Sequence, residues 1–195
     1  EAFGLLLPYF PTVLNQPDNL NVLRLHGQES LGSWFEQSLL ARRQQAFAFT
    51  YEIALDFTPV SFQQMAGLVC YYNSQKYIYF HITHNDISGR VLDISQCSAG
   101  WHANYPLADA LPIPAGGAVW LKADINHDLV TFSYKVGDLD WQALPLTLDY
   151  SVLSDEVGDG GADANFTGAF IGFCCQDLTG ARHYADIRSV HYCEK

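Results

Sequence analysis

Two carboxylates on one predicted strand are the first candidates for catalysis, since most glycosidases work with a pair of acids. Glu52 and Asp56 share one face of the alternating run 47–57. Four residues of extended chain place them about 13 Å apart, at ~3.3 Å per residue. A retaining pair needs about 5 Å, and an inverting pair at most about 9.5 Å. The spacing therefore excludes this pair, and we expect both side chains on the solvated face of the strand.

An acid-rich segment, 154–164, is the second candidate. It holds four acids, among them Asp155 and Glu156, and three glycines, and Phe166 follows it closely. Calcium binds oxygen-rich loops, but the spacing here is not that of an EF-hand, and Asp-Gly steps are also ordinary turn formers. We expect a mobile surface loop with no metal or cofactor, and calcium is the alternative. Gly-rich loops beside a large aromatic residue also serve as lids or binding loops.

Aromatic and polar side chains on predicted strands are the third candidate, because flat rings and hydrogen-bonding groups together suit a pyranose. Alternation places Tyr77, Tyr79 and His81 on one face of their strand. The full set of candidate sugar-contact residues is Tyr71, Tyr77, Tyr79, Gln64 and His81. The alternative is that aromatics at strand period simply pack a sandwich core, and it applies to most of them.

Composition excludes several classes of protein. With 195 residues, 49% hydrophobic and 16% charged, the chain is too apolar to be disordered and has the size of one domain. The net charge of −11 repels phosphates, so we expect neither a nucleic-acid nor a membrane partner. No apolar run reaches the ~20 residues that span a bilayer. The sequence also lacks a G-x-S-x-G elbow, a P-loop, a C-x-x-C pair and an H-E-x-x-H motif.

The cysteines bear on the cellular compartment. There are five, an odd number, and the adjacent Cys174 and Cys175 should point to opposite faces of a strand. We interpret them as buried free thiols in a reducing compartment rather than as a disulfide framework. The N-terminus shows no basic region followed by an apolar core, so we expect no signal peptide and a cytoplasmic location.

Period-two alternation dominates the chain after a proline-interrupted N-terminal arm or linker, which we place at residues 1–19. The segment 38–45 has helical propensity, but the surrounding strands favour a strand there. Residues 20–195 are therefore predicted to form one all-β domain, an antiparallel β-sandwich. Strands are predicted at residues 47–57, 64–72, 76–83, 90–96, 119–125, 130–134, 166–176 and 184–194.

Six sequence segments, in a fixed order, are more specific than the period-two alternation. They include LRLHGQESL, FEQSLLARRQ, FQQMAGLVCYYN, LSDE and FTGAFIG, at 23–31, 35–44, 62–73, 153–156 and 166–172, with Thr83-His84 between the third and the fourth. In this order they resemble the C-terminal β-sandwich of glycoside hydrolase family 43 β-xylosidases. The likeness covers about residues 20–194 and implies a concanavalin A-like jelly roll.

The resemblance also implies that catalysis and the accessory role belong to two different domains. In that family a preceding five-bladed β-propeller carries three carboxylates that hydrolyse xylosidic or arabinosidic bonds with inversion. This chain holds no propeller, so no catalytic residue carries over. The family's sandwich packs on the propeller and sends a loop with a phenylalanine to the active-site mouth. Phe166 matches that position, and Asp155 and Glu156 match the L-S-D-E segment before it, with a structural role.

Three functions follow from these observations. The first is an accessory domain of a β-xylosidase or α-arabinofuranosidase-like enzyme, with a catalytic propeller in cis or in trans and a xylo-oligosaccharide or arabinoside as substrate. The second is an independent carbohydrate-binding module that acts through its aromatic face. The third, a self-sufficient hydrolase, is disfavoured by the spacing of Glu52 and Asp56. The sequence leaves open whether the chain is a fragment or stands alone, and whether it forms an oligomer.

Overall fold

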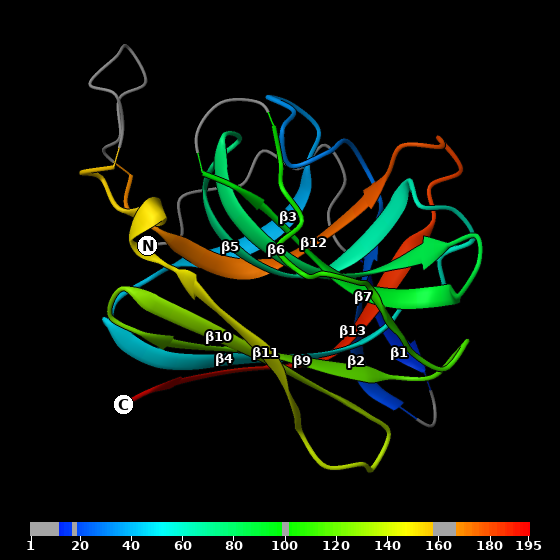
Figure 1. The fold of residues 1–195 in the computed structure, drawn as a ribbon. Helices are drawn as coiled ribbons and strands as arrows, with labels where there is room; N and C mark the ends of the chain where they lie inside the picture. The colour runs from blue at the N-terminus through cyan, green and yellow to red at the C-terminus, as the bar shows by residue number, and fades with distance from the viewer. Residues whose placement is uncertain (1–11, 17–18, 99–101, 158–166) are drawn as a thin grey trace.

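Two antiparallel sheets lie face to face in the computed structural model, which describes residues 12–16, 19–98, 102–157 and 167–195 (Figure 1). The seven-stranded sheet has the order β1-β2-β13-β4-β9-β10-β11. Its strands are β1 (Thr12–Gln16), β2 (Asn19–His26), β13 (Tyr184–Glu194), β4 (Ala48–Asp56), β9 (Val119–Asn126), β10 (Leu129–Val136) and β11 (Gln142–Asp149). The predicted all-β sandwich of concanavalin A-like type is confirmed.

The six-stranded sheet has the order β3-β12-β5-β6-β7-β8. Its strands are β3 (Ser38–Arg43), β12 (Phe170–Asp177), β5 (Gln64–Asn73), β6 (Lys76–Asn85), β7 (Gly89–Cys97) and β8 (Leu111–Pro112). One turn of 3-10 helix, η1 (Ser151–Leu153), follows β11 at one end of the sandwich.

The core fills the space between the sheets with the apolar half of each alternating strand. On β4, Phe49 and Ile53 face inward and are fully buried. From the facing sheet, Phe80 of β6 meets Phe132 of β10, with ring centroids 5.3 Å apart. Alternating strands place one half of their side chains on each face of a sheet, so the period-two pattern was sufficient to identify this core.

The segment with competing helical propensity is a strand. β3 pairs antiparallel with β12 along its whole length, from Ser38 opposite Cys175 to Arg43 opposite Phe170. The two backbones approach so closely that a Cβ on Gly172 would lie 2.1 Å from the Leu40 carbonyl oxygen. Tertiary pairing therefore overrides local propensity here.

Two boundaries differ from the sequence expectation by more than two residues. Thr12–Gln16, which fell within the expected arm of residues 1–19, forms β1 and pairs with β2. The strand expected over 166–176 begins at Phe170, because Gly168 has a φ of 70°. That left-handed conformation cannot extend a strand.

All five cysteines are free, and four of them are buried. Cys174 and Cys175 point to opposite faces of β12, as the strand period predicts. Cys175 joins the core between the sheets, and Cys174 lies on the outer face of the six-stranded sheet.

Candidate functional site

Hydrogen bonds hold both ends of the acid-rich segment against the sandwich, and we call these two ends the base of the loop. Asp155 follows η1, and its carboxylate accepts a hydrogen bond from the Tyr72 hydroxyl at the end of β5. The same carboxylate oxygen accepts a hydrogen bond from the backbone N–H of Gly168, at 3.2 Å, just before β12. One side chain therefore joins the two ends of the segment 156–167 to each other and to the core.

Two further groups support this base. Lys76, a buried residue at the start of β6, donates from Nζ to the carbonyl oxygen of Val157. Burial, together with the Asp155 carboxylate, raises the pKa of Tyr72, so the phenol remains a donor at neutral pH. The base of the loop is thus held from β5, β6 and the start of β12 at once.

Gly168 is required at this base for a geometric reason. Its φ of 70° is left-handed, and a Cβ there would lie 3.0 Å from a guanidinium nitrogen of Arg43. The next residue, Ala169, accepts a backbone hydrogen bond from Gln44 at 2.9 Å. The loop therefore closes against the connection between β3 and β4.

The predicted loop residues have different outcomes. Asp155 is the residue that joins the ends of the loop. Glu156 is exposed, and no side-chain hydrogen bond is found for it among the described residues. Phe166 and most of the acid-rich segment considered for calcium lie outside the described residues. Sequence reasoning missed Tyr72, Lys76 and Gly168, because a contact across 83 residues leaves no trace in one sequence.

The predicted sugar-contact face is largely interior. Tyr79 and His81 have no exposed surface, and Gln64 is 2% exposed, so none of the three offers a surface to a sugar in this chain. Tyr71 and Tyr77 are half-buried and pack against the same apolar cluster. We call it the outer cluster, and it consists of Leu31, Leu39, Val69, Tyr79 and Cys174.

Internal contacts occupy most polar groups of these residues, except Nε2 of His81, which is buried without a hydrogen-bond partner among the described residues. The Tyr79 hydroxyl donates to the Cys174 carbonyl oxygen at 3.0 Å, and its ring stacks on His81 with centroids 4.7 Å apart. The Gln64 side chain accepts from the backbone N–H of Val60 at 2.9 Å. Burial lowers the pKa of His81 to about 4, so the imidazole is neutral at pH 7. The aromatic alternation marks a second packed layer rather than an open binding face.

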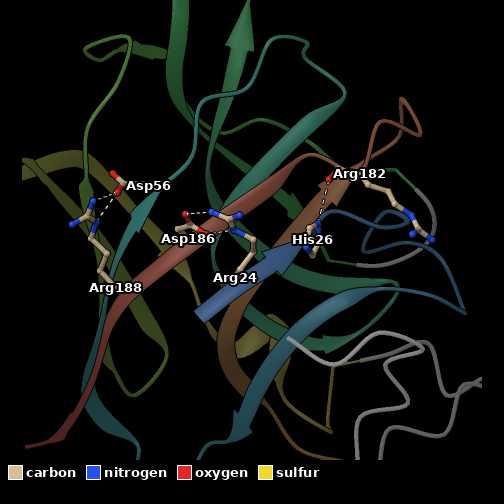
Figure 2. A network of polar contacts seen from close by, with 6 residues as sticks. All are labelled: Arg24, His26, Asp56, Arg182, Asp186 and Arg188. Carbon is tan, nitrogen blue, oxygen red and sulfur yellow. Dashed lines mark hydrogen bonds and ion pairs between the residues drawn. The ribbon is translucent and has the colours of Figure 1, made fainter. Parts of the chain in front are cut away.

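The carboxylates first tested for catalysis lie on the outer face of the seven-stranded sheet, where each has a cationic neighbour. Asp56 accepts from Nε of Arg188 at 2.6 Å, and Glu52 lies 3.5 Å from Nζ of Lys122. Figure 2 shows the Asp56–Arg188 pair beside a second pair, Arg24–Asp186, on neighbouring strands. The position on the outer face that the strand period predicts for Glu52 and Asp56 agrees with this arrangement.

A family model decides the identity of the fold. The model describes the β-xylosidase C-terminal concanavalin A-like domain, and it matches residues 11–193. The chain belongs to this glycoside hydrolase family 43 domain family. The resemblance carried by the ordered segments of the sequence is therefore confirmed.

Individual relatives of this domain are xylosidases. The β-xylosidase of Bacillus subtilis (strain 168) is 39% identical over 176 residues, which cover 90% of this chain and 32% of that protein. A xylosidase/arabinosidase of Humicola insolens is 37% identical over 161 residues, covering 81% and 30%. The crystal structure of xylan β-1,4-xylosidase from Bacillus halodurans C-125 matches with a TM-score of 0.83 and 39% identity, covering 89% of this chain and 33% of that one.

The sandwich domain spans about a third of the length of these relatives. In the part of the chain that the structure describes, no three His, Cys, Asp or Glu side chains gather as a metal site. No helix among the described residues is long and apolar enough to cross a membrane. The candidate site is the anchored loop base, whose hydrogen bonds fix where the segment after Asp155 leaves the fold.

Proposed function

We propose that this domain serves a catalytic β-propeller, in the same chain or in a second one, by packing on it and completing its substrate pocket with the loop after Asp155. The observation that supports this most directly is the anchored base of the loop. Asp155 bonds both Tyr72 and the Gly168 N–H, so a residue within the loop starts from a fixed frame. A fixed frame matters because displacements of about 1 Å from productive geometry are costly to catalysis.

The proposed substrate is a xylo-oligosaccharide or an arabinoside. Support comes from the names of two relatives, a β-xylosidase and a xylosidase/arabinosidase. We also propose a cytoplasmic location, supported by five free thiols, since secreted proteins tend to oxidise such residues. Within the loop, Phe166 is the proposed ring at the mouth of the pocket, by its match to the family motif.

The test measures hydrolysis by the domain together with its propeller, in one chain or coexpressed. On an aryl β-xyloside, Phe166→Ala should lower kcat/KM at least about fivefold, because an aromatic contact in a closed site is worth ~1 kcal/mol or more. Asp155→Ala, which releases both ends of the loop, should have a similar effect.

The matched control is Leu139→Ala, which removes an exposed apolar side chain from the turn between β10 and β11. It should leave kcat/KM unchanged. Unfolding temperatures of all three variants separate loss of the loop from loss of the fold. If both loop variants hydrolyse the xyloside at the rate of the unmodified protein, the loop has no part in the pocket and the proposal is wrong.

A further inference from the structure

A pocket of about 380 Å³ is lined in part by Ser151 and Leu153 of η1. Figure 1 shows η1 at one end of the sandwich. Its walls come from the connection between β3 and β4, the turn between β9 and β10, η1, and the residues just before β12. We call it the end pocket. Its size falls within the range of small-molecule sites, about 300–1,000 Å³.

Backbone hydrogen bonds hold the walls of the end pocket together. The N–H of His127 donates to the carbonyl oxygen of Phe47 at 2.7 Å, which joins the β9–β10 turn to the start of β4. The N–H of Tyr150 donates to the carbonyl oxygen of Asp128 at 2.7 Å, and the Tyr150 hydroxyl donates to Gln44 at 3.0 Å. A site built on such contacts is preorganised, so a ligand loses little free energy in ordering it.

An exposed aromatic ring lines the end pocket. Phe47 is 76% exposed although it adjoins a well-packed strand. Its ring is stacked on that of His127, with an interplanar angle of 10° and a distance of 6.5 Å between ring centroids. His127 reaches this position because its backbone is left-handed, with a φ of 58°. A flat apolar surface with a polarised face suits the C–H face of a sugar ring.

Polar groups with unused hydrogen-bonding capacity face the same space. Among the residues that the structure describes, the guanidinium of Arg43 and the carboxylate of Asp128 have no hydrogen-bond or ion-pair partner, although both line the pocket. One is a donor of fixed charge and the other an acceptor. The lining also includes the Asp155 carboxylate, which already accepts hydrogen bonds from Tyr72 and Gly168, so two acidic side chains and one basic side chain surround the pocket. This lining disfavours an anion, and the hydroxyl groups of a neutral ligand can accept from Arg43 and donate to Asp128.

We propose that the end pocket binds a single neutral pyranose or furanose ring, stacked on Phe47 and hydrogen-bonded by Arg43 and Asp128. The domain would then hold a carbohydrate site of its own, formed entirely by this chain. This inference goes beyond the loop-based function proposed above and does not depend on it.

The test titrates the 195-residue chain with D-xylose, L-arabinose and xylobiose, following binding by calorimetry and by NMR shift changes. A single ring held by one aromatic face and two polar groups should bind with a Kd on the order of 1 mM. Phe47→Ala should weaken binding at least about tenfold, and Asp128→Asn several-fold, because a charged acceptor makes a stronger hydrogen bond than a neutral one.

Phe62→Ala is the matched control, because Phe62 is also an exposed phenylalanine, at 63%, and it does not line the end pocket. It should leave the Kd unchanged. Circular dichroism and unfolding temperature confirm that each variant is folded. Absence of saturable binding by the unmodified chain, or equal affinity in Phe47→Ala, overturns the proposal. Because the chain is tested alone, that result leaves the kinetic test of the loop unaffected.

Discussion

The two outer faces of the sandwich differ in charge and in burial. The outer face of the seven-stranded sheet carries ion pairs between neighbouring strands, such as Arg24 with Asp186 and Arg188 with Asp56 (Figure 2). The outer face of the six-stranded sheet carries the outer cluster, with Tyr79 and His81 fully buried. The first face meets water, and the second is covered.

The covering comes in part from the connection between β2 and β3. Leu31 of that connection is buried in the outer cluster, and its N–H donates to the side chain of Gln176 at 2.9 Å. The six-stranded sheet is therefore sandwiched between two apolar layers. Alternation in its strands still separates two faces, but both faces are interior. We therefore expect substitutions in this sheet to lower the free energy of unfolding far more than substitutions on the charged face.

The largest difference between the faces should appear when one tyrosine is removed from each. Tyr79→Ala empties a fully buried site and leaves the Cys174 carbonyl without its donor, which should cost about 4 kcal/mol. Tyr184→Ala removes a ring that is 39% exposed beneath the Arg24 guanidinium and should cost about 1 kcal/mol. Urea unfolding of both variants measures the two costs, and similar values would show that the faces are equivalent.

Acid should destabilise the buried face through His81. Its pKa is about 4 in the fold and near 6.5 when exposed, so the unfolded chain binds the extra proton between those values. The free energy of unfolding should therefore be fully retained above pH 6.5 and fall, by up to about 3 kcal/mol, as the pH drops toward 4.

His81→Phe keeps a flat ring against Tyr79 and removes this titration, so its unfolding free energy should lose that part of the pH dependence. Asp93, directly opposite on β7, acts in the reverse direction because burial raises its pKa. Asp93 is present in both proteins, so their difference in urea midpoint between pH 7 and pH 4.5 reports the titration of His81. A difference that does not change with pH would contradict the assignment.

The smallest effect should come from the charged face itself. Arg24 donates two hydrogen bonds of 2.7 Å to Asp186, but both side chains keep about a fifth of their surface exposed. Asp186→Asn should therefore cost about 1 kcal/mol or less. A double-mutant cycle with Arg24→Gln, measured at low and at high salt, gives the coupling energy. We expect it to shrink with salt, whereas a coupling above about 2 kcal/mol in high salt would place this pair among buried ones.

Sequence alternation predicted most strands but not which faces are covered. It placed Ile78 and Phe80 opposite Tyr79 and His81 correctly, because side-chain direction is local information. Whether the second face is buried depends on Leu31, nearly fifty residues away, and one sequence cannot show that contact. The sugar-contact interpretation of that face was therefore wrong for Tyr79 and His81, which are interior.

The sequence also did not predict the edge strand β11 or the end pocket. β11 was not predicted, because Pro145 interrupts its alternation. The structure places β11 at the edge of the seven-stranded sheet, where a missing N–H is tolerated. The end pocket was also missed: Arg43 ends β3 and Phe47 lies in the connection after it, and only the fold brings them to Asp128 in the β9–β10 turn. The family segments, in contrast, carried enough residues to identify the domain.

The anchoring of the loop at Asp155 has a consequence for how this domain varies. Since one carboxylate holds both ends, the chain between them can lengthen, shorten or change composition at a small cost in closure entropy. Neither sheet has to adjust to such a change. The residues between Asp155 and Gly168 can thus be replaced, in evolution or by protein engineering, to change what the loop contacts. Tyr72, Asp155 and Gly168 must be kept.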